Sequence, residues 1–126
     1  MPLVHHELCF GCGRTNLFGL LLEVEQTAPG EVAGRCFLKQ DHQGPDRGRG
    51  HPGVVGVALA EAMALACGLE ARIVSYEVAV ADRAPVGAFL EVEARVERRD
   101  GPLAYAVASA RADQRMVAQA RGSFRW

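Results

Sequence analysis

The longest run of apolar residues in this chain extends from Pro52 to Gly68, and its only charged side chain is Glu61. The run is long enough for four helical turns and is apolar on every side, which is typical of a buried helix. It is shorter than the ~20 residues that a membrane-spanning helix needs. Pro52 suits the first helical position, where the missing N–H is tolerated. We therefore expect one long helix in the core.

Alternating apolar and polar residues predict strands on both sides of this helix. Before it, the alternation is interrupted by the turn signal Ala28-Pro29-Gly30, which predicts a hairpin. After it, Asp100-Gly101 is a strong signal for a tight hairpin turn. The predicted strands cover residues 20–26, 31–39, 72–82, 88–98, 103–112 and 115–125. This order predicts an α+β domain in which a curved antiparallel sheet of about six strands wraps the helix, with a partner subunit covering the rest.

Composition adds limits to this picture. A length of 126 residues, with 49% hydrophobic residues, predicts a single domain over residues 1–126. The net charge of −1 gives no electrostatic footprint for nucleic acid or an anionic membrane. The start of the chain lacks the pattern of a signal peptide, and the four cysteines are scattered. We therefore expect a reduced, cytoplasmic protein.

Glu61 is the first candidate for chemistry. A lone carboxylate on a buried helix should have a raised pKa unless a partner is supplied, and such groups mark functional sites. The alternative is a glutamate at a solvated gap or one paired with an arginine.

A second candidate lies near the start, where Cys9 and Cys12 form a CxxC motif behind His5 and His6. Thiolates and imidazoles are good zinc ligands, but no second CxxC or HxxxH follows to supply a fourth. A redox CxxC would need a βαβ pattern, which is absent here. We expect a structural turn with packed cysteines, and neither a metal nor another cofactor.

Several motifs, in order, make the chain resemble a known family. They are Cys9-Phe10-Gly11-Cys12-Gly13 with Asn16 and Gly19-Leu20, then His42-Gln43-Gly44, His51 to Ala66 with Glu61-Ala62-Met63, and Pro85-Val86-Gly87. Together they resemble the hotdog-fold thioesterase superfamily, in its phenylacetate-pathway-like (PaaI-like) branch that opens with CFGCG. The resemblance implies a hotdog fold, acyl thioesters of coenzyme A as substrates and no cofactor. It also implies a homodimer that pairs its sheets edge to edge, or a dimer of dimers.

In this family a backbone N–H at the helix N-terminus polarises the thioester carbonyl, and a helix carboxylate acts as base or nucleophile. The resemblance places these catalytic roles at Gly53 and Glu61. These two residues lie about 12 Å apart along a helix axis, so the pair should come from two subunits. The residues expected to bind substrate are His51, Gln43, Val54, Ser75 and Tyr76.

The chain departs from the family pattern at two positions. Pro52 stands where the first glycine normally gives its N–H, and Ala60 stands at the usual carboxylate position. Either donor and base have both shifted by one residue, or the catalytic pair is lost and the protein binds acyl thioesters without hydrolysing them. We favour the shifted pair, and hence an acyl-CoA thioesterase. A zinc-stabilised interaction module built on the CxxC segment is a third alternative.

Overall fold

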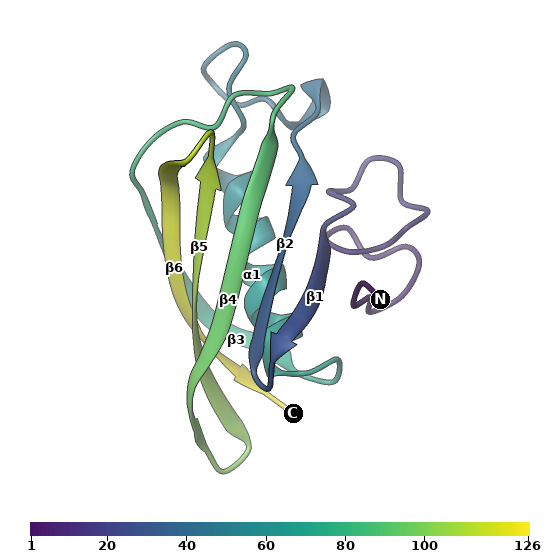
Figure 1. Cartoon of the computed structure of the whole chain (residues 1–126), viewed down its shortest axis with the longest axis vertical. Coiled ribbons are helices and arrows are strands. Elements are labelled where there is room, and N and C mark those ends of the chain that lie inside the picture. Colours follow the sequence, from purple (N-terminus) through teal and green to yellow (C-terminus); the bar gives the residue numbers. More distant parts are fainter.

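The computed structural model describes all residues, 1–126, and consists of one helix and one sheet. The strand order is β1-β2-β4-β5-β6-β3, and every neighbouring pair is antiparallel. Figure 1 shows the sheet curving around α1. The elements are β1 (Glu23–Ala28), β2 (Glu31–Phe37), the short 3-10 helix η1 (Gln40–His42), α1 (Pro52–Cys67), β3 (Arg72–Val80), β4 (Phe89–Asp100), β5 (Leu103–Ala112) and β6 (Arg115–Arg125). The predicted helix-and-sheet architecture is confirmed.

The bounds of α1 follow from its end residues. His51 is the N-cap, and Pro52 occupies the first helical turn as expected. Gly68 ends the helix with a φ of 132°, a backbone conformation that favours glycine. Beyond it, Arg99 donates a hydrogen bond of 3.4 Å to the carbonyl of Cys67, one of the carbonyls left without a helical partner.

The concave face of the sheet is lined by small side chains, which lets the helix approach closely. On β5, Ala104, Ala106, Ala108 and Ala110 are all buried, as the alternation predicted. The helix contacts every strand from β2 to β6. Larger side chains fill the remaining space, among them Leu59, Met63, Leu90 and Phe124.

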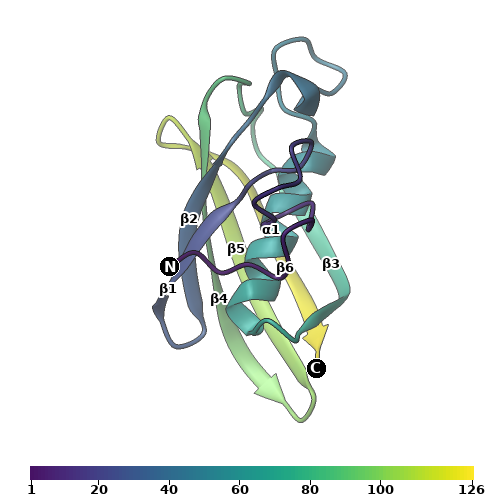
Figure 2. The ribbon, with the colours of Figure 1, turned by 90° about the vertical axis from the view of Figure 1, so that its right-hand side faces the viewer.

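The segment of residues 1–22 covers the face of α1 that the sheet leaves open (Figure 2). Its backbone is fixed by Leu3 donating to the Val24 carbonyl at 2.9 Å and by Leu22 donating to the Gly11 carbonyl at 2.8 Å. The strand predicted for residues 20–26 begins only at Glu23. The reason is Leu21, whose φ of 52° is left-handed and cannot continue an extended strand. The other predicted strand ends agree within two residues.

Two strands form the edges of the sheet, β1 and β3. Strand β3 is exposed along most of its length, and its exposed apolar side chains are Ile73, Val74, Tyr76 and Val80. Val74 has no partner on β6, because the register shifts between Ile73 and Ser75. No helix in the structure has the length and apolarity required to cross a membrane.

Candidate functional site

Glu61 lies on the side of α1 that faces the N-terminal segment. Its side chain is only 14% exposed, and its Oε2 atom is 2.8 Å from Nδ1 of His5. The thiol of Cys9 donates to the same oxygen at 3.2 Å. Glu61 is therefore paired, with a histidine and a cysteine that precede it in the chain by more than fifty residues.

Cys12 completes the group. It is fully buried, its sulfur lies 3.4 Å from Nδ1 of His5, and it accepts the backbone N–H of His5 at 3.1 Å. One ligand-type atom from each of His5, Cys9, Cys12 and Glu61 lies within 4.8 Å of all the others. We call these four residues the N-terminal cluster. His6 is not part of it, because its side chain is exposed and accepts the N–H of Leu8 instead.

Close packing explains both glycines of the CFGCG motif, Gly11 and Gly13. A Cβ atom on Gly11 would lie 2.5 Å from Cγ and Cδ of Glu61, so only glycine lets the segment sit against that carboxylate. A Cβ atom on Gly13 would lie 2.4 Å from the carbonyl oxygen of Glu7. The CFGCG motif and the helix carboxylate thus form one packed unit.

His5 supplies a partner to Glu61, so the raised pKa expected of an unpaired carboxylate does not occur. Burial by itself raises the pKa of Glu61, but hydrogen bonds from His5, Cys12 and Cys9 and the charge of His5 outweigh it, so the pKa lies below its ordinary value. Burial also raises the pKa of the Cys12 thiol far above its usual range. The sequence did not identify the partner of Glu61. We had considered an arginine, and the structure shows a histidine, His5. A carboxylate with a lowered pKa is a weaker general base.

The N-terminus of α1 is closed by His51. Nδ1 of His51 accepts the N–H of Gly53 at 2.8 Å, and its carbonyl accepts the N–H groups of Val54 and Val55 at 2.9 and 3.1 Å. Pro52 has no N–H. The N–H expected to polarise a substrate carbonyl is therefore occupied by the exposed side chain of His51.

A hollow of about 250 Å³ lies beside this end of α1 and the end of edge strand β3. Its apolar wall includes Val55, Val80 and Val117. Two arginines and two aspartates also line it, namely Arg49, Arg83, Asp46 and Asp82, and Arg83 pairs with Asp46 at 3.2 Å. The sequence pattern did not indicate this hollow, because its lining comes from α1 and from separate loops and strands.

The remaining predicted substrate-binding residues lie apart from this hollow. The side chain of Gln43 forms hydrogen bonds within its own loop. It accepts the N–H of Gly48 at 2.6 Å and donates to the Gln40 carbonyl at 3.1 Å. The hydroxyl of Ser75 meets that of Ser123 at 3.0 Å. Tyr76 packs against α1 at Gly56, and Val54 is half-buried in the first helical turn.

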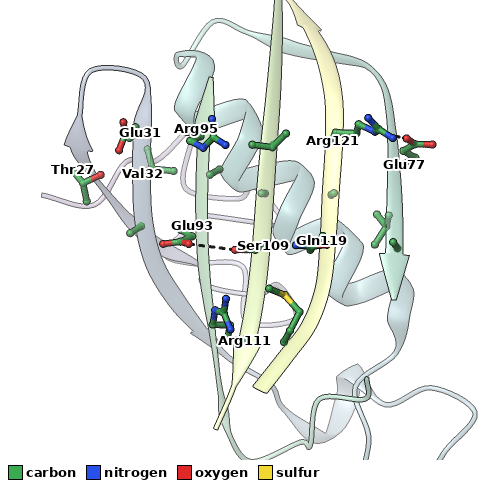
Figure 3. Close-up of a pocket in the computed structure, with 18 residues that line it drawn as sticks. Thr27, Glu31, Val32, Glu77, Glu93, Arg95, Ser109, Arg111, Gln119 and Arg121 are labelled. Carbon is green, nitrogen blue, oxygen red and sulfur yellow. Dashed lines mark hydrogen bonds and ion pairs between the residues drawn. The ribbon is translucent and has the colours of Figure 1, made fainter. Parts of the chain in front are cut away.

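A hollow of about 1010 Å³ lies on the sheet face opposite α1 (Figure 3). Acidic and basic side chains alternate across it, including Glu31, Glu93, Arg95, Arg111 and Arg121. Neither this hollow nor the smaller one is lined by a predicted site residue, but the smaller one is lined by Pro52 and Val55, which flank Gly53 and Val54 in the first turn of α1. We therefore place the candidate site at the N-terminus of α1.

Comparisons with known proteins agree on the fold. No family model and no curated protein matches the sequence. Among solved structures, the E. coli PaaI protein of the phenylacetic acid degradation operon is 16% identical with a TM-score of 0.77, over 84% of this chain and 79% of that one. Zebrafish thioesterase superfamily member 2 is 20% identical with a TM-score of 0.74, over 82% and 80%. A mutant of the phenylacetic acid degradation protein PaaI from Thermus thermophilus is 24% identical with a TM-score of 0.75, over 82% and 91%. The helix-wrapped sheet and these likenesses show that the chain has the hotdog fold.

Proposed function

We propose that this chain acts on acyl thioesters, first of all those of coenzyme A, as a slow thioesterase whose site lies between two copies. The proposal is supported by the hotdog fold, which the chain shares with solved structures named as thioesterase superfamily and PaaI proteins. It is also supported by the order of motifs that resemble the PaaI-like branch.

The observation that carries the proposal is the hollow beside the N-terminus of α1. Its volume of about 250 Å³ is below the roughly 300–1,000 Å³ of complete ligand pockets. It adjoins β3, an edge strand whose exposed apolar side chains and unpaired backbone suit a second copy. Two copies joined along β3 would extend each hollow into a full acyl site.

The chemistry of the proposed site follows from the helix end. Hydrolysis of a thioester places negative charge on the carbonyl oxygen, which the N–H groups and dipole of a helix N-terminus stabilise. The N–H of Gly53 takes this role once the side chain of His51 moves away. Arg49, which lines the hollow, is the candidate contact for the phosphates of coenzyme A, because Arg83 is already paired with Asp46.

Glu61 is not the base in this proposal. Its carboxylate is held by His5 and Cys9, faces the N-terminal segment and has a lowered pKa. A site with an oxyanion donor but no base still accelerates acyl transfer, by roughly 10³–10⁴-fold over water in a well-studied hydrolase. We therefore expect turnover that is slow and independent of Glu61.

The test is thiol release from short, medium, long and aryl acyl-CoAs, with binding measured by calorimetry. Glu61→Gln should leave thiol release within about twofold of the parent protein, and Glu70→Gln is the exposed control. Ala60→Asp, which restores a carboxylate at the family position, should raise release by on the order of 10²-fold or more, the contribution typical of a positioned base. Pro52→Gly, which adds an N–H, should also raise it.

Two results would contradict this reading. If Glu61→Gln abolishes release, the catalytic pair is Gly53 with Glu61, as the spacing of eight residues first predicted. If no thioester binds the parent protein and Ala60→Asp gains no activity, the chain does not act on acyl thioesters.

A further inference from the structure

We infer that the N-terminal cluster is a zinc site, with His5 Nδ1, Cys9 Sγ, Cys12 Sγ and the Glu61 carboxylate as its four ligands. This site is separate from the thioester site at the end of α1 and does not depend on the proposed function. Its role is to fix residues 5–12 across the open face of the core helix.

The donor set matches the preference of the metal. Zinc in structural sites takes four ligands from cysteine sulfur, histidine nitrogen and carboxylate oxygen. The CxxC motif with its upstream histidine supplies three of them from one short loop. The sequence offered no fourth ligand nearby, and the fold supplies it from the middle of α1.

The distances between the donors fit a tetrahedron. Zinc bonds of about 2.0–2.3 Å at tetrahedral angles place neighbouring ligand atoms roughly 3.3–3.8 Å apart. Here the Cys9–Glu61, Cys12–His5 and Cys9–His5 separations are 3.2, 3.4 and 3.9 Å. The hydrogen-bonded pair of His5 and Glu61, at 2.8 Å, must open slightly to admit an ion, and every other pair of donor atoms lies within 4.8 Å. Small adjustments of the four side chains would bring the donors to bonding distance of one ion.

The surroundings of the ligands also suit a metal. The backbone N–H of His5 donates to the sulfur of Cys12 at 3.1 Å, a hydrogen bond that supports a thiolate ligand. The N–H of Gly13 donates to the Cys9 carbonyl at 2.9 Å and closes the loop that carries both cysteines. Gly11 keeps that loop against Glu61.

The site is closed, which favours a structural role. Cys12 is fully buried, and the side chains of His5 and Glu61 are 13% and 14% exposed. Four protein ligands leave no open position for a substrate or a reactive water, in contrast to catalytic zinc sites. Zinc binding to the folded chain should stabilise it, because only folding brings Glu61 to the three ligands of the N-terminal loop.

The experiment uses the full chain without a histidine tag, reduced and stripped of metal by a chelator. Zinc is titrated against a chromophoric competitor, and Co²⁺ serves as the spectroscopic probe. We expect one ion per chain, an intense visible spectrum typical of tetrahedral Co²⁺, and a thiolate-to-cobalt charge-transfer band in the near ultraviolet.

Variants assign the ligands. His5→Ala, Cys9→Ala and Glu61→Gln should each weaken zinc binding by at least about a hundredfold, since even outer partners of a ligand are worth roughly 10–100-fold. The matched controls His6→Ala, Cys67→Ala and Glu70→Gln should bind like the parent protein. Zinc should raise the unfolding temperature of the parent and the controls, and leave that of the ligand variants unchanged.

Other results would overturn the inference. These are no stoichiometric zinc binding by the parent protein, a weak octahedral cobalt spectrum, or unchanged binding in Cys9→Ala. If a ligand variant does not fold, the cobalt spectrum of the parent protein still decides, because the charge-transfer band requires thiolate ligands.

Discussion

His42 is the buried side chain whose polar atoms are least well satisfied. Its Nδ1 accepts the N–H of Lys39 at 3.1 Å, while Nε2 faces the carbonyls of Phe18 and Gly19 without a hydrogen bond of good geometry. Burial, together with the charge of Lys39, lowers the pKa of His42, although Asp41 and these carbonyls oppose the shift. The folded protein therefore keeps this imidazole neutral at a pH where the unfolded chain begins to protonate it.

We predict that this histidine makes the fold sensitive to mild acid. The pKa of His42 in the folded protein lies below its unfolded value of about 6.5. The contribution of His42 to the free energy of unfolding is therefore constant above that pH. It falls below that pH, with a slope of up to about 1.4 kcal/mol per pH unit. His42→Asn keeps an acceptor for Lys39 but cannot titrate. Urea unfolding at pH 7, 6 and 5 should therefore show a smaller loss of stability in His42→Asn than in the parent protein.

His6, an exposed histidine outside the N-terminal cluster, provides the control for the experiment on His42. His6→Asn should follow the pH dependence of the parent protein, because His6 is exposed. Parallel curves for the parent protein and His42→Asn would show that His42 does not carry the effect.

At the scale of elements, two of the three hairpins of the sheet, β4–β5 and β5–β6, turn through different residues in left-handed conformations. Strands β4 and β5 are joined through Gly101, with a φ of 60°. Strands β5 and β6 are joined through Asp113 and Gln114, with φ values of 50° and 65°. Two consecutive left-handed residues define a type I′ turn, which favours glycine, above all at the second position.

We predict that Gln114→Gly stabilises the protein by about 0.5–1 kcal/mol, because it removes the strain of a left-handed side chain. Gly101→Ala should destabilise it by a similar amount, since only open space surrounds Gly101 and the effect is purely conformational. Denaturant midpoints at constant m-value measure both changes. A destabilised Gln114→Gly would mean that the side chain of Gln114 makes a stabilising contact.

At the scale of the whole molecule, strand β3 forms an exposed apolar edge of the sheet. Ile73, Val74 and Val80 are 45%, 55% and 52% exposed. An exposed apolar edge strand is a template for pairing with another strand. By contrast, the N-terminal segment already runs along β1, where Leu3 donates to the Val24 carbonyl.

We predict a dimer in solution that pairs along β3. Val74→Lys places a charge on this edge, and it should raise the dimer dissociation constant by at least about tenfold, equivalent to about 1.4 kcal/mol. Light scattering across a concentration series measures the constant, and circular dichroism checks the fold. Gln26→Lys, on the opposite edge, should leave the dimer intact. A parent protein that is monomeric, or a Val74→Lys protein that dimerises normally, would contradict this arrangement.

Local patterns predicted most of the elements because helices and strands impose their periods on neighbouring residues. The apolar run after His51 and the alanine alternation of β5 appear in the structure as a buried helix and a buried sheet face. The start of β1 was missed because the left-handed Leu21 breaks the strand while Leu20 and Leu22 remain buried. Burial alternates there without strand pairing, so the pattern alone could not place the boundary.

The N-terminal cluster was less predictable, for a physical reason. The sequence identified Glu61, Cys9 and Cys12 as candidates for chemistry, but it did not indicate that they meet. The contact between His5 and Glu61 spans 56 residues, and no periodicity reports a contact at such a separation. By itself the sequence therefore determined one apolar helix, its strands and the residues able to do chemistry. Only the tertiary structure, by folding residues 1–22 across α1, decided that Glu61 faces a histidine and two thiols, and so set its charge, its partners and its role.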